Sequence, residues 1–155
     1  PLLQWSNNNH FIHRFIEFMP MGNLPFWSWK RIVTEQEIRT SLERMGKLIP
    51  LEIDTPSSPA KYYQWEYSGQ VLGFISPMTN KFCACCNRLR LTSDGKIKLC
   101  LFSNISYDLR ELIRNNRCDE IIEMLKSLIT KKMINENCNG IATFTQSLHM
   151  NQIGG

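Results

Sequence analysis

The sequence predicts an α/β chain in which one strand and one helix precede an α+β region. Residues His10–Met19 are rich in aromatic and β-branched side chains, a pattern typical of a parallel strand covered on both faces. A helix is predicted over 34–46, and strand followed by helix forms half of a βα repeat. The rest of the chain predicts short strands, a cysteine-bearing hairpin and two further helices. We therefore predict two domains, 1–54 and 55–155.

Length and composition limit the protein class. A chain of 155 residues with 43% hydrophobic content is long enough to bury a core. No apolar run approaches the roughly 20 residues that span a membrane, and no signal-peptide pattern is present. The net charge of +4 fits a small anionic ligand as well as nucleic acid, and the sequence has no basic tract of the kind found in a nucleic-acid-binding tail. Because the sequence opens at Pro1 and turns apolar almost at once, we expect a piece of a longer protein.

A capping box predicts the start of the first helix. Thr34 is followed three residues later by Glu37, and Gly46 is the expected C-terminal stop. The apolar residues at helical spacing are Ile38, Leu42, Met45 and Ile49. The segment Asp54–Ala60 has the composition of a loop.

Two strands and two helices are predicted after this loop. The strands are Tyr62–Tyr67 and Gln70–Pro77, which flank a turn at Ser68 and Gly69. Ser106–Asn115 predicts a short helix and Asp119–Met133 a longer one, each with an apolar stripe. Residues 135–155 show no strong periodicity.

The hydrophobic pattern selects the register of a hairpin over residues 88–101. A two-residue loop would pair Leu91 with Lys98, which sets an apolar side chain against a charged one. A three-residue loop with Gly95 in the left-handed conformation instead pairs Leu91 with Ile97 and Leu89 with Leu99. We therefore predict the longer loop.

This register has a chemical consequence. It sets Arg88 opposite Cys100 and Arg90 opposite Lys98, all on one face, with Cys86 two residues before Arg88. Arginine forks bind phosphate through paired hydrogen bonds. We expect the thiols and guanidinium groups to converge, although a solvated strand face would show the same arginine pattern.

Cys83, Cys86 and Cys100 form the candidate metal site. Three thiolates are one short of a closed tetrahedral zinc site, but they match an iron–sulfur cluster that leaves one iron without a cysteine ligand. A zinc site would need a fourth ligand. The candidates for it are Cys118, Cys138 and His149. The pattern does not decide the roles of Cys85, Cys118 or Cys138.

Five segments together resemble a known family. They are Arg14–Pro20, Phe74–Met78, Phe82–Lys96, Cys100–Phe102 and Ile153–Gly155. The chain resembles the C-terminal part of GTP 3′,8-cyclase, the molybdenum cofactor biosynthesis protein A family of radical S-adenosylmethionine enzymes. The resemblance implies the last strand and helix of an incomplete (β/α)6 barrel, followed by an α+β iron–sulfur region with a double-glycine tail.

The resemblance also implies cofactors and site residues. Cys83, Cys86 and Cys100 would ligate a C-terminal 4Fe-4S cluster whose open iron binds the base of GTP. Arg88, Leu89 and Arg90 would form the GTP-binding stretch, with the phosphates on the arginines. Met19 would contact S-adenosylmethionine, and Arg14 is a weaker substrate candidate. The family converts GTP to (8S)-3′,8-cyclo-7,8-dihydroguanosine 5′-triphosphate in molybdenum cofactor biosynthesis.

One feature of the family is missing from this chain. No Cys-x3-Cys-x2-Cys motif is present. In the family this motif binds a second 4Fe-4S cluster, at the N-terminus, which generates the radical. We therefore expect this lyase fragment to be inactive alone. A non-catalytic iron–sulfur or zinc module remains the alternative. GTP is the expected partner, without nucleic acid or membrane, and a homodimer is left open. The expected compartment is the cytoplasm in a bacterium or the mitochondrial matrix in a eukaryote.

Overall fold

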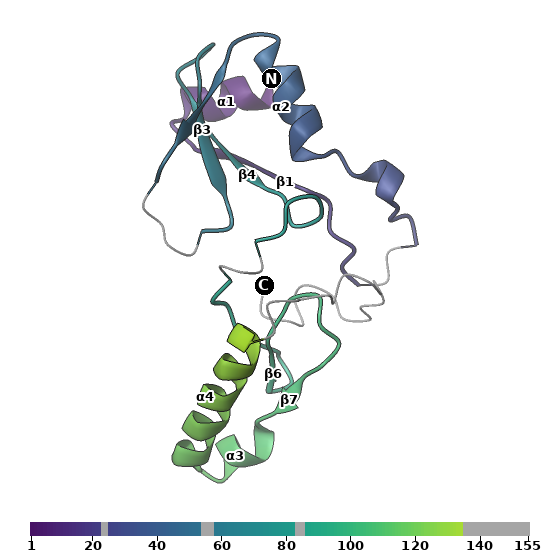
Figure 1. Cartoon of the computed structure of the whole chain (residues 1–155), viewed down its shortest axis with the longest axis vertical. Helices are drawn as coiled ribbons and strands as arrows, with labels where there is room; N and C mark the ends of the chain where they lie inside the picture. Colours follow the sequence, from purple (N-terminus) through teal and green to yellow (C-terminus); the bar gives the residue numbers. More distant parts are fainter. Residues whose placement is uncertain (23–24, 54–57, 83–85, 135–155) are drawn as a thin grey trace. The chain divides into compact units, whose positions relative to one another are not determined.

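The computed structural model describes residues 1–22, 25–53, 58–82 and 86–134, and it divides the chain into two compact units. The first unit contains Pro1–Met19 and Ser28–Phe82, and the second contains Pro20–Trp27 and Cys83–Gly155. Each unit has its own sheet and its own helices (Figure 1). The predicted boundary between residues 54 and 55 falls inside the first unit.

The first unit is built on a four-stranded sheet with the order β1-β4-β3-β2. Its elements are α1 (Leu2–Asn8), β1 (His13–Ile16), the 3-10 helix η1 (Trp29–Arg31), α2 (Glu35–Glu43), β2 (Leu48–Leu51), β3 (Lys61–Trp65) and β4 (Val71–Ile75). Strand β1 runs parallel to β4 at one edge, whereas the β2, β3 and β4 pairings are antiparallel. The predicted parallel strand and the turn at Ser68 and Gly69 are therefore confirmed.

The core of the first unit lies on one face of this sheet. Leu72 and Phe74 alternate along β4, and both are buried. Their partners in register, Tyr63 on β3 and Phe15 on β1, share that face. Residues from α1 and α2 complete the cluster, among them Leu3, Ile38 and Leu42. The helices therefore cover the face that holds the large apolar side chains.

Strand β1 is shorter and less covered than predicted. The predicted strand over His10–Met19 narrows to His13–Ile16, and the side chain of Ile16 is 57% exposed. An edge position explains the difference, because β1 pairs only with β4 among the described strands. The expectation of apolar burial on both faces was wrong for this strand within the first unit.

Helix α2 begins where predicted and ends earlier. Thr34 accepts a hydrogen bond from the Glu37 N–H, and the Glu37 carboxylate accepts one from the Thr34 N–H at 2.7 Å, so the capping box is confirmed. The helix ends at Glu43 and not at Gly46, because the indole N–H of Trp65 bonds the carbonyls of Leu42 and Gly46. Ile49, which continued the helical spacing of apolar residues beyond the predicted helix, lies in β2.

The second unit combines a three-stranded antiparallel sheet with two helices. Its elements are β5 (Arg90–Leu91), β6 (Lys96–Lys98), β7 (Tyr107–Asp108), α3 (Arg110–Arg114) and α4 (Cys118–Ile134), with the strand order β5-β6-β7. Ile97 of β6 packs with Leu109 and with Leu128 of α4, and this cluster is the core of the unit. The long helix predicted over Asp119–Met133 is therefore confirmed.

The short helix predicted over Ser106–Asn115 was wrong in its first part. Tyr107 pairs with Ile97 in the sheet, and the Asp108 carboxylate accepts a hydrogen bond from the Arg110 N–H at 2.9 Å. The helix therefore starts at Arg110, because the aspartate satisfies an N–H group at the helix start. Helix α1 and strand β2 were not predicted.

Taken together, the described elements form a mixed α/β chain, as the sequence predicts. No helix among the described residues is both long and apolar enough to cross a membrane. The tail over 135–155, the loop residues 54–57 and Cys83, Cys85 and Cys138 lie outside the described residues.

Candidate functional site

The hairpin has the predicted register. Arg90 pairs with Lys98 and Leu91 pairs with Ile97, as the three-residue loop requires. Gly95 has φ +77°, which is the left-handed conformation predicted for it. The ladder stops at Arg90 and Lys98, so the predicted pairs of Leu89 with Leu99 and Arg88 with Cys100 lie beyond it. The register is confirmed, and the strands are shorter than predicted.

A buried threonine fixes the turn. The Thr92 hydroxyl accepts a hydrogen bond from the Lys96 N–H at 2.9 Å and donates one to the Asp94 carboxylate at 2.6 Å. The Lys96 ammonium lies 2.7 Å from the other Asp94 oxygen, and these two contacts lower the pKa of the Asp94 carboxyl. The loop is therefore tied at both ends, which holds the two strands in one register.

Lys98 places a buried cation beside Cys100. The Lys98 side chain lies in β6, and the residue is 2% exposed. Burial lowers the pKa of its ammonium; the Cys100 sulfur opposes this shift, and the Arg90 guanidinium adds to it. The Cys100 sulfur and the Arg90 guanidinium therefore both lie within electrostatic range of the Lys98 ammonium. The sequence pattern predicts a role for Arg90 and Cys100 but none for Lys98.

Lys132 supplies a second cation, which lies beside Cys86. Its ammonium lies 3.5 Å from the Cys86 sulfur and donates a hydrogen bond to the backbone carbonyl of Arg88. Lys132 belongs to the last turn of α4 and follows Cys86 by 46 positions in the sequence. Sequence reasoning missed it because no local pattern joins the end of a helix to a distant loop.

The thiols described in this unit fit a thiolate-bound metal group. Cys86 and Cys100 are both half-buried, and each has a cation beside it that would offset thiolate charge. Among the described residues no three metal-binding side chains converge, but Cys83 lies outside them. The predicted three-cysteine set therefore stays a prediction.

The basic side chains near the hairpin loop have acidic partners, whereas some of those near Cys86 and Cys100 have none among the described ion pairs. At the loop end, Asp108 holds Arg110 through contacts of 3.0 Å to the Arg110 Nε, and this lowers the pKa of the Asp108 carboxyl to about 2. Within the described part of the chain, no acidic side chain forms an ion pair with Arg88, Lys98 or Lys132. The cysteine end is therefore the more suitable one for an anion.

Met19 and Arg14 belong to the first unit. Met19 is half-buried and lies three residues beyond β1, so strand alternation does not relate it to Arg14. Arg14 lies over the Tyr62 ring, with 5.6 Å between its Cζ and the ring centroid. Gly73 lies between them in the sheet, because it pairs with Arg14 on one side and with Tyr62 on the other. A Cβ at this position would lie 3.0 Å from the Arg14 Cγ. The glycine thus permits this contact across the sheet.

A buried carboxylate organises the carboxyl ends of β1 and β4. Glu17 is 4% exposed, and it accepts hydrogen bonds from the N–H groups of Met78 at 2.9 Å and Thr79 at 3.0 Å. It also accepts from the Thr79 hydroxyl and from the Glu35 N–H at 3.2 Å. Glu17 therefore ties the loop after β4 to the start of α2, next to Met19. No pattern in the sequence predicts this role of Glu17.

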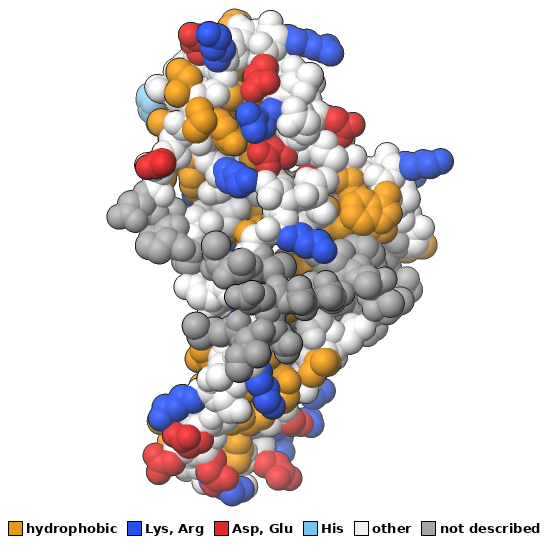
Figure 2. Space-filling model, in the orientation of Figure 1, with side chains coloured by type: hydrophobic (Ala, Val, Ile, Leu, Met, Phe, Trp, Pro, Cys, Tyr) orange, Lys and Arg blue, Asp and Glu red, His pale blue; other side chains and the backbone are white. Residues whose placement is uncertain are grey.

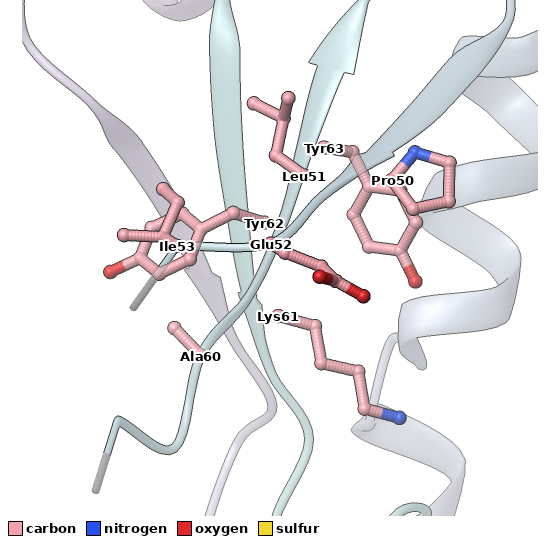
Figure 3. A pocket seen from close by; sticks show the side chains of 8 residues that line it. All are labelled: Pro50, Leu51, Glu52, Ile53, Ala60, Lys61, Tyr62 and Tyr63. Carbon is pink, nitrogen blue, oxygen red and sulfur yellow. The ribbon is translucent and has the colours of Figure 1, made fainter. Parts of the chain in front are cut away.

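The first unit also contains a shallow pocket of about 330 Å³ between β2 and β3. Figure 3 shows the Tyr62 ring on the left and the Tyr63 ring on the right, with the Glu52 carboxylate between them and the Lys61 side chain below. Residues 54–57, which connect the two strands here, lie outside the described residues. None of the predicted site residues lines this pocket.

Known proteins match nearly the whole chain. The family model for Molybdenum Cofactor Synthesis C matches residues 11–137. A GTP 3′,8-cyclase from Thermodesulfovibrio yellowstonii is 39% identical over 97% of this chain and 46% of its own length. Those from Alkaliphilus oremlandii and Syntrophomonas wolfei are 40% and 38% identical over 92% of the chain.

These matches cover only part of each relative. The chain spans 43% to 46% of the length of these three proteins, so it corresponds to less than half of each. The family model nevertheless covers well over half of this chain, including the hairpin with its cysteines and arginines. The chain belongs to the Molybdenum Cofactor Synthesis C family.

Proposed function

We propose that this chain is the substrate-binding C-terminal part of a GTP 3′,8-cyclase. The proposal rests on the family membership and on one structural observation, the hairpin register that sets Arg90 against Lys98 beside Cys100. The whole reaction, from GTP to the cyclic dihydroguanosine triphosphate, would also need the Cys-x3-Cys-x2-Cys motif that this sequence lacks. The last strand and helix of a (β/α)6 barrel would then correspond to β1 and α2.

In this proposal Cys83, Cys86 and Cys100 hold a 4Fe-4S cluster. When bound, the cluster would supply an iron with an open coordination position for the guanine base. The chain's own contribution is electrostatic and geometric. Lys98 and Lys132 offset thiolate charge at Cys100 and Cys86, which would otherwise disfavour a polyanion nearby.

The phosphates of GTP are assigned to Arg88 and Arg90, with Leu89 between them. Arg88 is exposed and Arg90 is half-buried, so Arg88 is the more accessible of the two to a ligand. Planar guanidinium groups bind phosphate oxygens in pairs, which orients the triphosphate as well as attracting it. Met19 is proposed to contact S-adenosylmethionine from the first unit.

Iron analysis tests the cluster assignment. The chain is purified and reconstituted without oxygen, and iron, sulfide and zinc are measured for the wild type, Cys83→Ser and Cys86→Ser. We expect a brown protein with about four irons per chain, loss of colour in both variants, and wild-type iron in the control Cys118→Ser, which changes an exposed residue. One zinc and no iron would support the zinc module and reject the cluster.

GTP titration tests the phosphate assignment separately. Arg88→Ala should weaken GTP binding about 10- to 100-fold while leaving the iron content unchanged, because a charge-assisted hydrogen bond is worth about 1.5–3 kcal/mol. Arg117→Ala is the matched control, since Arg117 is exposed and pairs with Glu120 on the surface. Equal GTP affinity in Arg88→Ala and Arg117→Ala would reject the phosphate role of Arg88.

A further inference from the structure

Lys132 differs from its neighbours on α4 in what it contacts. Two lysines lie in the last turn of this helix, where a cation is favourable next to the helix C-terminus. The Lys131 ammonium turns toward Tyr107, 5.8 Å from the ring centroid. Lys132 reaches in another direction, to the Cys86 sulfur and the Arg88 carbonyl. A cation that served only the helix end would not need these two contacts.

The two contacts of Lys132 join the proposed ligands of two different groups. Cys86 is a proposed metal ligand, and Arg88, two residues later, is a proposed phosphate ligand. One ammonium has three N–H donors, so it can hold the backbone carbonyl and the sulfur at the same time. The carbonyl contact anchors the ammonium to the protein backbone, so its position does not depend on the sulfur alone.

We propose that Lys132 is a positioning residue that fixes the Cys86–Arg88 segment against α4 and donates an N–H···S hydrogen bond to the Cys86 thiolate when metal is bound. This inference rests on the proposed role of Cys86 as a cluster ligand, and nothing in the family comparison assigns Lys132 a role. Hydrogen bonds and positive charge at cluster sulfurs stabilise the reduced, more negative cluster. Lys132 should therefore raise the reduction potential and slow the loss of iron.

Hydrogen–deuterium exchange on the metal-free chain tests the anchoring. Lys132→Met removes the ammonium and keeps a side chain of similar length, whereas Lys132→Arg keeps the charge. The control is Lys126→Met, because Lys126 lies on the same helix and its exposed ammonium pairs with Glu123 at 2.8 Å. Figure 2 shows acidic and basic side chains mixed over this end of the second unit, which is typical of a solvated surface.

We expect peptides covering residues 86–90 to exchange at least threefold faster in Lys132→Met than in Lys126→Met, with helicity unchanged by circular dichroism. Lys132→Arg should stay within about twofold of the wild type, so the result does not depend on one variant that folds poorly. Equal exchange in Lys132→Met, Lys132→Arg and Lys126→Met would overturn the anchoring.

The reconstituted protein gives the second measurement. Lys132→Met should lose iron to the chelator bathophenanthroline disulfonate several times faster than Lys126→Met, and its midpoint potential should shift to more negative values. An unchanged potential and an unchanged rate of iron loss would overturn the hydrogen bond to sulfur. If the wild type binds no iron, the proposed function fails, and the exchange measurement still decides whether Lys132 anchors the segment.

Discussion

Replacing Glu17 by glutamine tests how the first unit holds the loop after β4. One carboxylate oxygen of Glu17 accepts from the Met78 and Thr79 N–H groups, and the other accepts from the Glu35 N–H and the Thr79 hydroxyl. Glutamine turns one of these oxygens into an NH2 group. In the better orientation the NH2 faces the hydroxyl, which can rotate and accept, so only the Glu35 N–H loses its acceptor.

The magnitude follows from this arrangement. A buried N–H without an acceptor costs about 1–3 kcal/mol, and the remaining bonds to Glu17 lose the extra strength that a charged acceptor gives them. Glu17 is 4% exposed, so water cannot replace the lost acceptor. We expect Glu17→Gln to lower the free energy of unfolding of the first unit by about 2–4 kcal/mol.

Urea unfolding of the chain measures this effect. The transition is monitored by near-ultraviolet circular dichroism, to which the buried Trp65 of this unit contributes. The matched control is Glu43→Gln, since Glu43 is exposed and lies 3.5 Å from Arg39 on the same helix. Such a surface pair is worth about 0–1 kcal/mol. If Glu17→Gln and Glu43→Gln unfold at the same urea concentration, the buried network does not hold the loop and the reasoning is wrong.

Three further predictions concern the hairpin, helix α2 and the acid response. Gly95→Ala should destabilise the second unit by about 1–2 kcal/mol in urea, because Gly95 has φ +77° and a Cβ would lie 2.8 Å from the Arg110 Cγ; a neutral result would contradict the left-handed turn. Thr34→Ala should cost about 1 kcal/mol in thermal unfolding through loss of the capping box, and Glu37→Gln less. The pKa of Asp108 is about 2 in the folded chain, below the ordinary 3.8, so its stabilising contribution is complete above pH 3.8 and disappears as the pH falls through 2. An NMR titration of the Asp108 carboxyl should show this low pKa, and Arg110→Met should move it back toward 3.8.

Local patterns predicted the parts of the fold in which neighbours along the chain decide the structure. Thr34 and Glu37 are three residues apart, and their capping box forms as predicted. The hairpin register also follows from residues within ten positions of each other, because a slip by one residue would bury charge and expose the apolar side chains. In both cases the energetic preference is already present in the segment itself.

Distant partners explain most of the errors. Helix α2 stops early because the Trp65 indole, more than twenty residues later, takes up the carbonyls of Leu42 and Gly46. The short helix α3 starts late because Tyr107 pairs with Ile97 of β6 and because Asp108 accepts the Arg110 N–H at the helix start, and both contacts depend on a third strand that the pattern did not predict. Lys132 could not be predicted for the same reason, since its partner Cys86 is forty-six positions away. None of these contacts leaves a periodic pattern in the sequence.

The proposed metal group and the proposed substrate repel each other electrostatically. Different cations around the hairpin offset the charge of each group. Thiolates and a triphosphate are both negative, and two like charges 4 Å apart repel by about 4 kcal/mol at the effective dielectric constant near a protein surface. Lys98 is buried beside Cys100, so its charge acts mainly on the thiolate. Arg88 has an exposed side chain, and only its backbone carbonyl is joined to Lys132, so its guanidinium can reach a ligand. Loss of Lys98 should therefore reduce iron retention more than GTP affinity, whereas loss of Arg88 should reduce GTP affinity more than iron retention. A variant at either position that lowered both equally would show that one charge acts on both groups.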